Sequence, residues 1–252
     1  MPTDPEKLKA EIDARHLEMV GAFVPVNFRD INAHQSGEMA AVKTAELLSK
    51  TNSGNPFIIL SDNNGSNEFR TKNAGRISNG HGLSEKEWKI FPEGVEKIAR
   101  AVKEKTGLRT VFHHHCAGFV ETPAEIEMLM NHTDENLVGL CLDMGHYKFG
   151  GGDPVEAIKK YKRRIWHVHF KDCHKESAEK SRAMSWDYFT SVKNGVFCEL
   201  GKGEVDFHRV LGELKNIDYS GWIVVEQDVL PGMGAPMECA VRNREFIKSL
   251  GV

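Results

Sequence analysis

Residues 137–170 read LVGLCLDMGHYKFGGGDPVEAIKKYKRRIWHVHF, and this stretch predicts the architecture of the chain. Two apolar runs, Leu137–Leu142 and Ile165–Phe170, have the length and continuity of strands that are buried on both faces. Between them a helix is expected over Pro154–Tyr161, because Pro is favoured at the first helical position. A strand, a helix and a second strand in this order form a parallel β–α–β unit.

The same alternation continues on both sides of this stretch, and one long polar segment, Ser61–Gly82, is expected to be a loop. The further strands that we expect are Leu17–Val24, Pro56–Leu60, Leu108–His113 and Trp222–Glu226. The further helices that we expect are Pro5–Arg15, Gly37–Ser49, Ser84–Lys105, Pro123–Met130, Ser185–Lys193, Phe207–Leu214 and Pro236–Leu250. No linker divides them, so residues 1–252 are expected to form one α/β domain. Six strands fit a doubly wound sheet slightly better than a closed barrel, which has eight.

Composition narrows the class of ligand and the compartment. The chain has 252 residues and a formal net charge of −3, so charge gives no reason to expect a nucleic acid or an acidic membrane as partner. It contains no run of about 18 apolar residues that would cross a membrane. The cysteines are five in number, widely spaced and without a CxxC pair. This is typical of a reducing compartment, so a cytoplasmic protein with a small-molecule substrate is expected.

Histidine and carboxylate side chains stand where several predicted strands end. Asp143, His169 and Glu226 each follow an apolar run, and a fourth strand ends in the triplet His113–His115. One strand that ends in Asp or His is more often an ordinary loop start, but four in one chain favour a site. Nitrogen and carboxylate oxygen together suit Mn²⁺, Co²⁺, Mg²⁺ or Zn²⁺.

The position of these side chains decides between the two fold classes. In (β/α) barrels the catalytic groups come from the carboxyl ends of several strands and converge on one face. We therefore predict a TIM (β/α) barrel that is incomplete, with about six β/α units. The glycines at 150–152 could be mistaken for a phosphate loop, but no GK[ST] follows, and a turn before the next helix explains them.

The chain resembles a known family along most of its length from Leu83 onward. The motifs that carry the resemblance are the triplet His113–His115, Val120–Thr122, Gly139–His146, Gly151–Pro154, His167–Asp172, Gly195–Phe197, Gly201–Gly203 and Val224–Asp228. As a set in this order they are similar to the sugar isomerase/epimerase-like barrels, also called xylose isomerase-like barrels, and within them to inosose dehydratase-like proteins. Residues 1–30 resemble the family's second helix and third strand, which implies that its first two strands have no counterpart here.

The resemblance implies roles for particular residues. It places the metal, with Mn²⁺ or Co²⁺ favoured over Mg²⁺ or Zn²⁺, on Asp143, His169 and Glu226, and leaves the fourth ligand open among His113, His115 and Glu121. We assign His113 as that ligand. The predicted catalytic residues are Lys171, His146 and Glu226, and the predicted substrate contacts are His115, His146, Asp172 and Glu121.

The function that the resemblance implies is dehydration of a ketopolyol such as 2-keto-myo-inositol through a metal-stabilised enolate. The alternatives are a sugar isomerase or 3-epimerase with the same site, and a partial barrel that has lost catalysis. The same barrel also serves abasic-site endonucleases, but the chain lacks the basic patch that DNA binding needs. An open barrel would expose strand edges, which makes a homo-oligomer an expectation.

Overall fold

The computed structural model describes residues 2–51, 54–78, 80–228 and 230–252. Its contacts divide the chain into two compact units. The first unit consists of the chain up to Asn63 with Leu83–His113 and Leu129–Leu140, and the second consists of Asn64–Gly82, His114–Met128 and Cys141–Val252. A single domain over the whole chain stays a prediction.

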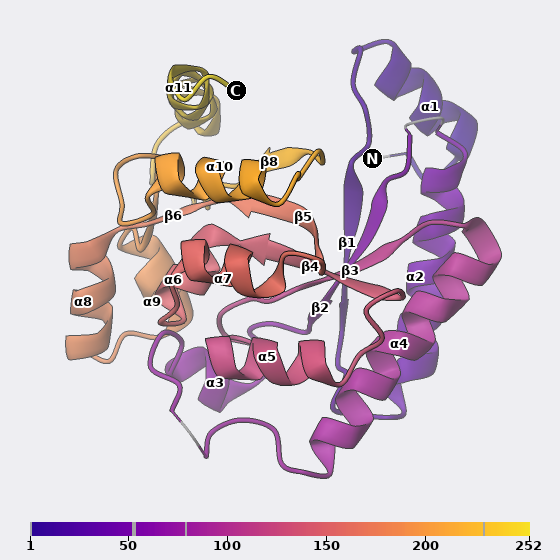
Figure 1. The fold of residues 1–252 in the computed structure, drawn as a ribbon, viewed down its shortest axis with the longest axis horizontal. Coiled ribbons are helices and arrows are strands. Elements are labelled where there is room, and N and C mark those ends of the chain that lie inside the picture. Colours follow the sequence, from indigo (N-terminus) through magenta and orange to yellow (C-terminus); the bar gives the residue numbers. More distant parts are fainter. Residues whose placement is uncertain (1, 52–53, 79, 229) are drawn as a thin grey trace. The chain divides into compact units, whose positions relative to one another are not determined.

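The first unit contains parallel strands covered by long helices. The strands are β1 (Gly21–Val26), β2 (Phe57–Asp62) and β3 (Thr110–His113), and the helices are α1 (Pro5–Asp13), α2 (Ala33–Ser49) and α4 (Glu87–Thr106). Strand β2 pairs in parallel with both β1 and β3. Helices α2 and α4 pack against each other and against these strands (Figure 1).

Local sequence signals explain where the helices of the first unit begin and end. Asp4 caps α1 by accepting a hydrogen bond from the backbone N–H of Lys7 at 2.9 Å. Before α4, the Glu87 carboxylate accepts from the backbone N–H and the hydroxyl of Ser84, at 2.8 and 2.7 Å, as the capping-box pattern predicts. Gly107 ends α4 with a φ of 74°, in the left-handed region that favours glycine.

The second unit holds most of the predicted site residues. Its elements in chain order are α3 (Glu68–Lys72), α5 (Pro123–Asn131), β4 (Val138–Asp143), α6 (Met144–Phe149), α7 (Pro154–Tyr161), β5 (Ile165–Phe170), β6 (Asp172–Cys173), α8 (Lys175–Ala183), α9 (Tyr188–Lys193), β7 (Phe197–Cys198), α10 (Phe207–Asn216), β8 (Ile223–Val225) and α11 (Pro236–Ser249). Helix α5 and strand β4 each belong partly to the first unit. Strand β8 is parallel to β5, whereas β6 and β7 form a short antiparallel pair.

The order of the strands distinguishes a barrel from a doubly wound sheet. Among the described residues, six strands are hydrogen-bonded in the order β1-β2-β3-β4-β5-β8. Each strand of this sheet therefore lies beside the next one along the chain, as in a (β/α) barrel, whereas a doubly wound sheet reverses its order part-way. The prediction of an incomplete (β/α) barrel of about six units is confirmed. No described helix combines the length and apolar character that crossing a membrane requires.

Some elements differ from the expectation. The predicted loop Ser61–Gly82, in which Asn79 lies outside the described residues, contains helix α3, because Asn67 caps it and its buried Arg70 ties it to the rest of the unit. Strand β1 continues past Pro25 to Val26. Since β1 stands at the end of the strand order, the N–H that proline lacks is not needed by a second neighbour.

Candidate metal centre and its surroundings

The three predicted ligands with the firmest support come together in the second unit. Asp143 ends β4, His169 lies on β5, and Glu226 follows β8. Their ligand atoms lie within 4.8 Å of one another. The Nδ1 atom of His169 is 3.1 Å from Glu226 Oε1 and 3.7 Å from Asp143 Oδ2. One ring nitrogen therefore faces two carboxylates.

The two oxygens of Asp143 have different tasks. Oδ1 caps helix α6 by accepting a hydrogen bond from the backbone N–H of His146 at 2.8 Å. Oδ2 is directed to His169 and to Lys171, whose Nζ is 3.9 Å away. The cap thus fixes the carboxylate in a position in which its second oxygen meets the charged groups of the centre. Since the side chain is fully buried, solvent screens these interactions little.

Lys171 is the buried cation of this centre. Its Nζ lies 3.2 Å from Glu226 Oε2 and 3.3 Å from Asp228 Oδ2. Burial lowers the pKa of Lys171, but the carboxylates of Asp143, Asp228 and Glu226 outweigh burial and raise the pKa above its ordinary value. The side chain is therefore an ammonium at neutral pH and can donate a proton. This environment keeps Lys171 protonated and so favours a role as acid over a role as base.

Two of the same carboxylates, Asp143 and Glu226, also act on the pKa of His169. Burial lowers the pKa of its ring, whereas Cys141, Asp143 and Glu226 together raise the pKa well above its ordinary value. A proton is thus attracted to the point where the ring nitrogen meets the two carboxylates. A cation at this point would be stabilised by the same charges.

The donor set fits a divalent metal ion. One imidazole nitrogen and two carboxylates lie close enough to share an ion. Three carboxylates surround the centre if Asp228 is included, against one ammonium. Mixed nitrogen and oxygen donors of this kind are typical sites for Mn²⁺, Co²⁺ or Zn²⁺ and do not select one of them.

A wall of aromatic rings adjoins Lys171. The rings of His115 and His146 are 3.9 Å apart between centroids, and His146 meets Phe197 edge to face at 4.6 Å. The Nζ of Lys171 is 3.2 Å from Nε2 of His146 and lies over the Phe197 ring at 4.9 Å. The Tyr188 hydroxyl is 3.4 Å from Nε2 of His115. These rings position His146 against the ammonium and give the site an apolar side.

Comparison with known proteins shows the family of the chain. The family described as "Xylose isomerase-like TIM barrel" matches residues 2–250. The chain belongs to this family. An inosose dehydratase of Clostridium perfringens is 34% identical to this xylose isomerase-like barrel over 248 residues, which are 98% of this chain and 82% of that relative.

Solved structures agree with the barrel fold. A 3-keto-D-glucoside 4-epimerase from E. coli superposes with a TM-score of 0.71 and 17% identity, over 97% of this chain and 84% of that one. A probable 3-DHS dehydratase involved in petrobactin synthesis, from Bacillus anthracis, superposes with a TM-score of 0.68 and 14% identity, over 98% of this chain and 82% of that one. Both likenesses concern the fold alone.

In this xylose isomerase-like barrel Asp172 holds a loop. Its carboxylate accepts hydrogen bonds from the backbone N–H groups of four residues, at 2.8 to 3.1 Å; these are Cys173, Gly201, Gly203 and Val205. A carboxylate that is bound to four backbone donors has little capacity left for a ligand. The predicted substrate contact by Asp172 is therefore not supported by its geometry, although its neighbour Lys171 lies in the centre.

Glu121 is also bound to the backbone. Its two oxygens accept from the N–H groups of Gly75 at 2.7 Å and Ala117 at 2.9 Å, and its side chain is fully buried. Burial raises the pKa of Glu121 to about 7. Among the described residues, Glu121 belongs to no group that could hold a metal ion. Its predicted role as a substrate contact and its candidacy as the fourth ligand thus lack support from its contacts.

The other two candidates for the fourth ligand are His113 and His115. His113 ends β3 in the first unit, where its buried ring meets that of Phe23 edge to face at 6.1 Å. His115 lies in the aromatic wall, and its Nδ1 is 2.5 Å from the carbonyl oxygen of Cys116. His113 as the fourth ligand, and His115 as a substrate contact, stay predictions.

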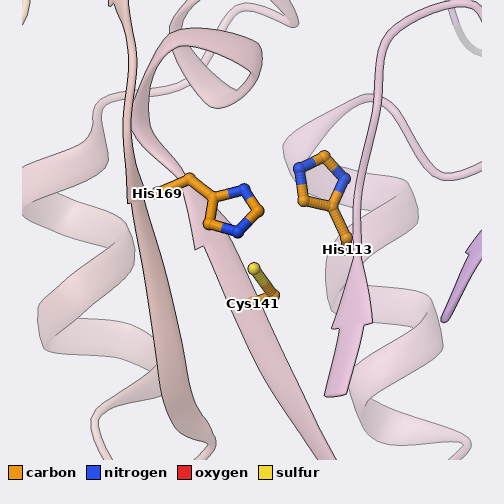
Figure 2. A group of neighbouring side chains, drawn as sticks. All are labelled: His113, Cys141 and His169. Atoms are coloured by element: carbon orange, nitrogen blue, oxygen red, sulfur yellow. The ribbon is translucent and has the colours of Figure 1, made fainter. Parts of the chain in front are cut away.

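Sequence reasoning missed two residues of the centre. Cys141 is not among the predicted site residues, but its sulfur lies beside the His169 ring (Figure 2). The signal was present, because Cys141 precedes Asp143 by two positions on a strand and so shares its face. Asp228 stands two positions after Glu226 and contacts the same ammonium. Asp228 belongs to the motif Val224–Asp228, in which the sequence pattern assigns a role to Glu226 alone.

Proposed function

We propose that this chain is a metal-dependent hydro-lyase that dehydrates a ketopolyol such as 2-keto-myo-inositol. The observation that carries the proposal is the charged Lys171, whose Nζ lies 3.2 Å from Glu226 Oε2 at the edge of the candidate metal centre. Inosose dehydratases at 32–34% identity over 98% of the chain support the same reaction class.

Dehydration next to a carbonyl needs two proton transfers. A base removes the proton on the carbon beside the carbonyl, and an acid protonates the hydroxyl that leaves from the next carbon. Held by Asp143, His169 and Glu226, a divalent ion would supply a Lewis acid that polarises the carbonyl. The products are water and an enol, which tautomerises to a dione.

Lys171 is the acid of this scheme. It carries its proton at neutral pH, because the surrounding carboxylates raise its pKa. It gives this proton to the leaving hydroxyl, which departs as water. His146, whose Nε2 is 3.2 Å from Nζ, orients the ammonium and is placed to return a proton to Lys171 after each turnover.

Glu226 is the base that we favour. Its carboxylate follows β8, and its side chain is 36% exposed, so that a substrate can reach it. Asp143, in contrast, is fully buried and capped onto α6. Since Lys171 is charged and His115 is bound into the aromatic wall, neither competes with Glu226 for the role of base.

The test is incubation of the purified protein with 2-keto-myo-inositol and Mn²⁺ or Co²⁺. We expect the absorbance of a dione to grow, and chelation by EDTA to stop it. Added Mn²⁺ or Co²⁺ should restore the rate, and the more active ion identifies the preferred cofactor. If the ketopolyol is isomerised or epimerised without water loss, the same centre serves the alternative reaction. Absence of any metal-dependent conversion would contradict both.

The cellular setting belongs to the same proposal. All five cysteines carry free thiols, which fits a reducing cytoplasm; they are Cys116, Cys141, Cys173, Cys198 and Cys239. Self-association stays a prediction, which light scattering of the purified protein would check.

A further inference from the structure

The His169 ring has neighbours at both of its nitrogens. Nδ1 faces Glu226 at 3.1 Å and Asp143 at 3.7 Å. On the other side is Cys141, whose thiol is fully buried and hydrogen-bonded to the ring. In Figure 2 the sulfur lies beside the ring nitrogen that is farther from the His169 backbone, which is Nε2. The ring thus separates the sulfur from the carboxylates.

Strand geometry keeps this arrangement fixed. Cys141 and Asp143 are two residues apart on β4, so that both side chains point to the same face of the sheet. His169 comes from β5, the next strand in the sheet order. Cys141 therefore meets one nitrogen of the ring while Asp143 meets the other, and the spacing along β4 sets the distance between them.

We propose that Cys141 is a positioning residue, which accepts the Nε2–H of His169 and thereby leaves the Nδ1 lone pair for the metal ion. The inference rests on the proposed function, because it concerns the same centre. A neutral imidazole has one N–H donor and one acceptor nitrogen, so a partner at one nitrogen selects the state of the other. Ligand histidines are commonly fixed through the nitrogen that does not bind the metal.

The geometry separates Cys141 from the carboxylate ligands. Among the described residues, Asp143 and Glu226 share one candidate donor group with His169, whereas Cys141 shares a second group with His169 that lacks both carboxylates. To bind the same ion as Asp143 and Glu226, the sulfur would have to face the Nδ1 side of His169. The ring of His169 instead lies between the sulfur and the two carboxylates. Cys141 thus acts through His169.

Metal affinity tests the inference directly. Cys141→Val replaces the thiol by an apolar side chain that offers no acceptor, and Cys141→Ser restores a polar acceptor. The matched control is Cys239→Val, which removes a buried thiol from α11. Each purified protein is titrated with Co²⁺ alone, after thermal unfolding has shown that it is folded.

We expect Cys141→Val to weaken Co²⁺ binding by about 10- to 100-fold. Cys141→Ser should recover affinity to within a few-fold of the wild type, and Cys239→Val should bind like the wild type. Equal affinity of wild type and Cys141→Val would overturn the inference. So would a strong near-ultraviolet sulfur-to-cobalt band that Cys141→Ser abolishes, because the thiolate would then be a ligand.

The outcome is separable from that of the proposed function. If the wild type binds Co²⁺ and Cys141→Val binds it weakly, the positioning role stands even where no ketopolyol is dehydrated. If dehydration occurs but Cys141→Val retains full affinity and rate, the function stands and the positioning role fails. A wild type that binds no Co²⁺ would contradict both.

Discussion

Two groups of buried charges in the second unit are built in different ways. In one, the guanidinium of Arg70 binds both oxygens of Glu125, at 2.8 and 2.9 Å, and donates to the carbonyl oxygen of Gly118 at 2.6 Å. In the other, the ammonium of Lys171 lies 3.2 Å or more from each of its carboxylates, of which Glu226 is the nearest.

This difference in geometry distinguishes a cluster that stabilises the fold from one that is suited to catalysis. Around Arg70 a bidentate pair and backbone groups fix each charge, which is the geometry of a rigid support. Around Lys171 three carboxylates share one ammonium and one imidazole, so negative charge is in excess. Burial is common to both. The excess charge and the partly exposed carboxylates distinguish the centre that can accept a cation and a substrate.

Lys171→Met is expected to have the largest effect and tests the difference between the two clusters most directly. If Lys171 is the acid, the variant should lose about 10²- to 10⁴-fold in kcat at saturating Co²⁺. Its Co²⁺ affinity should not fall, because a competing positive charge has been removed. Rates of dione formation and Co²⁺ titrations check both expectations. Lys202→Met, which removes a largely exposed lysine, is the control. A kcat within threefold of the wild type would place Lys171 among the structural charges.

Arg70→Met should act on stability instead. Breaking a buried pair leaves the Glu125 carboxylate without its partner, which costs about 3–5 kcal/mol of unfolding free energy. Urea unfolding measures this loss, and Lys72→Met, in an exposed pair with Glu68, should change the unfolding free energy far less. Turnover of the folded fraction should remain close to that of the wild type. A selective loss of turnover would show that the Arg70 cluster takes part in the chemistry.

Glu121 predicts a pH effect of known sign. Its pKa is about 7 in the folded chain and 4.5 as the ordinary value, so the folded state binds more protons between these values. The unfolding free energy should therefore fall as pH rises through this window, by about 1.4 kcal/mol for each unit of pKa difference. Glu121→Gln should lack this slope. Urea unfolding of both proteins from pH 5 to pH 8 checks it, and parallel curves would contradict the assignment.

Asp228→Asn should give the smallest effect. The carboxylate is 34% exposed, so that solvent weakens its hold on Lys171, and Glu226 remains as a nearer partner. We expect a loss of less than about tenfold in kcat, since a general acid as a whole contributes about 10²- to 10⁴-fold. Steady-state kinetics measure kcat and KM separately. A loss as large as that of Lys171→Met would make Asp228 an essential part of the acid.

Much of the fold was predictable because its signals are local. The ranges Pro154–Tyr161 and Ile165–Phe170 were predicted with the bounds that the structure shows, since a Pro and an apolar run mark them. Helices α6 and α8 were missed. Helix α6 has only 6 residues and begins at the cap formed by Asp143, a residue whose place at a strand end predicts a ligand.

The site was predictable only in part for a related reason. Asp143, His169 and Glu226 stand at strand ends, where chain direction and alternation bring side chains together. The contacts of Asp172 and Glu121 depend on loops that fold back over long stretches of sequence; Asp172 and Gly201, for example, are 29 positions apart. Such long-range loop contacts leave no periodic pattern in the sequence. A carboxylate that accepts hydrogen bonds from the backbone therefore cannot be distinguished, from the sequence, from a carboxylate that faces a site.

The bonds of Asp172 to the loop at 201–205 have a consequence for how such barrels diversify. One carboxylate shapes that loop through backbone N–H groups, so the loop's side chains can vary while its path is kept. Asp172 also follows Lys171 directly, and the same bonds hold the backbone that presents the ammonium. Loop and aspartate should thus be inherited as one module. A loop that is grafted from another barrel would have to be transferred together with its own aspartate. Without that aspartate, the backbone that carries Lys171 would lose its hydrogen bonds to the loop, and the ammonium would shift.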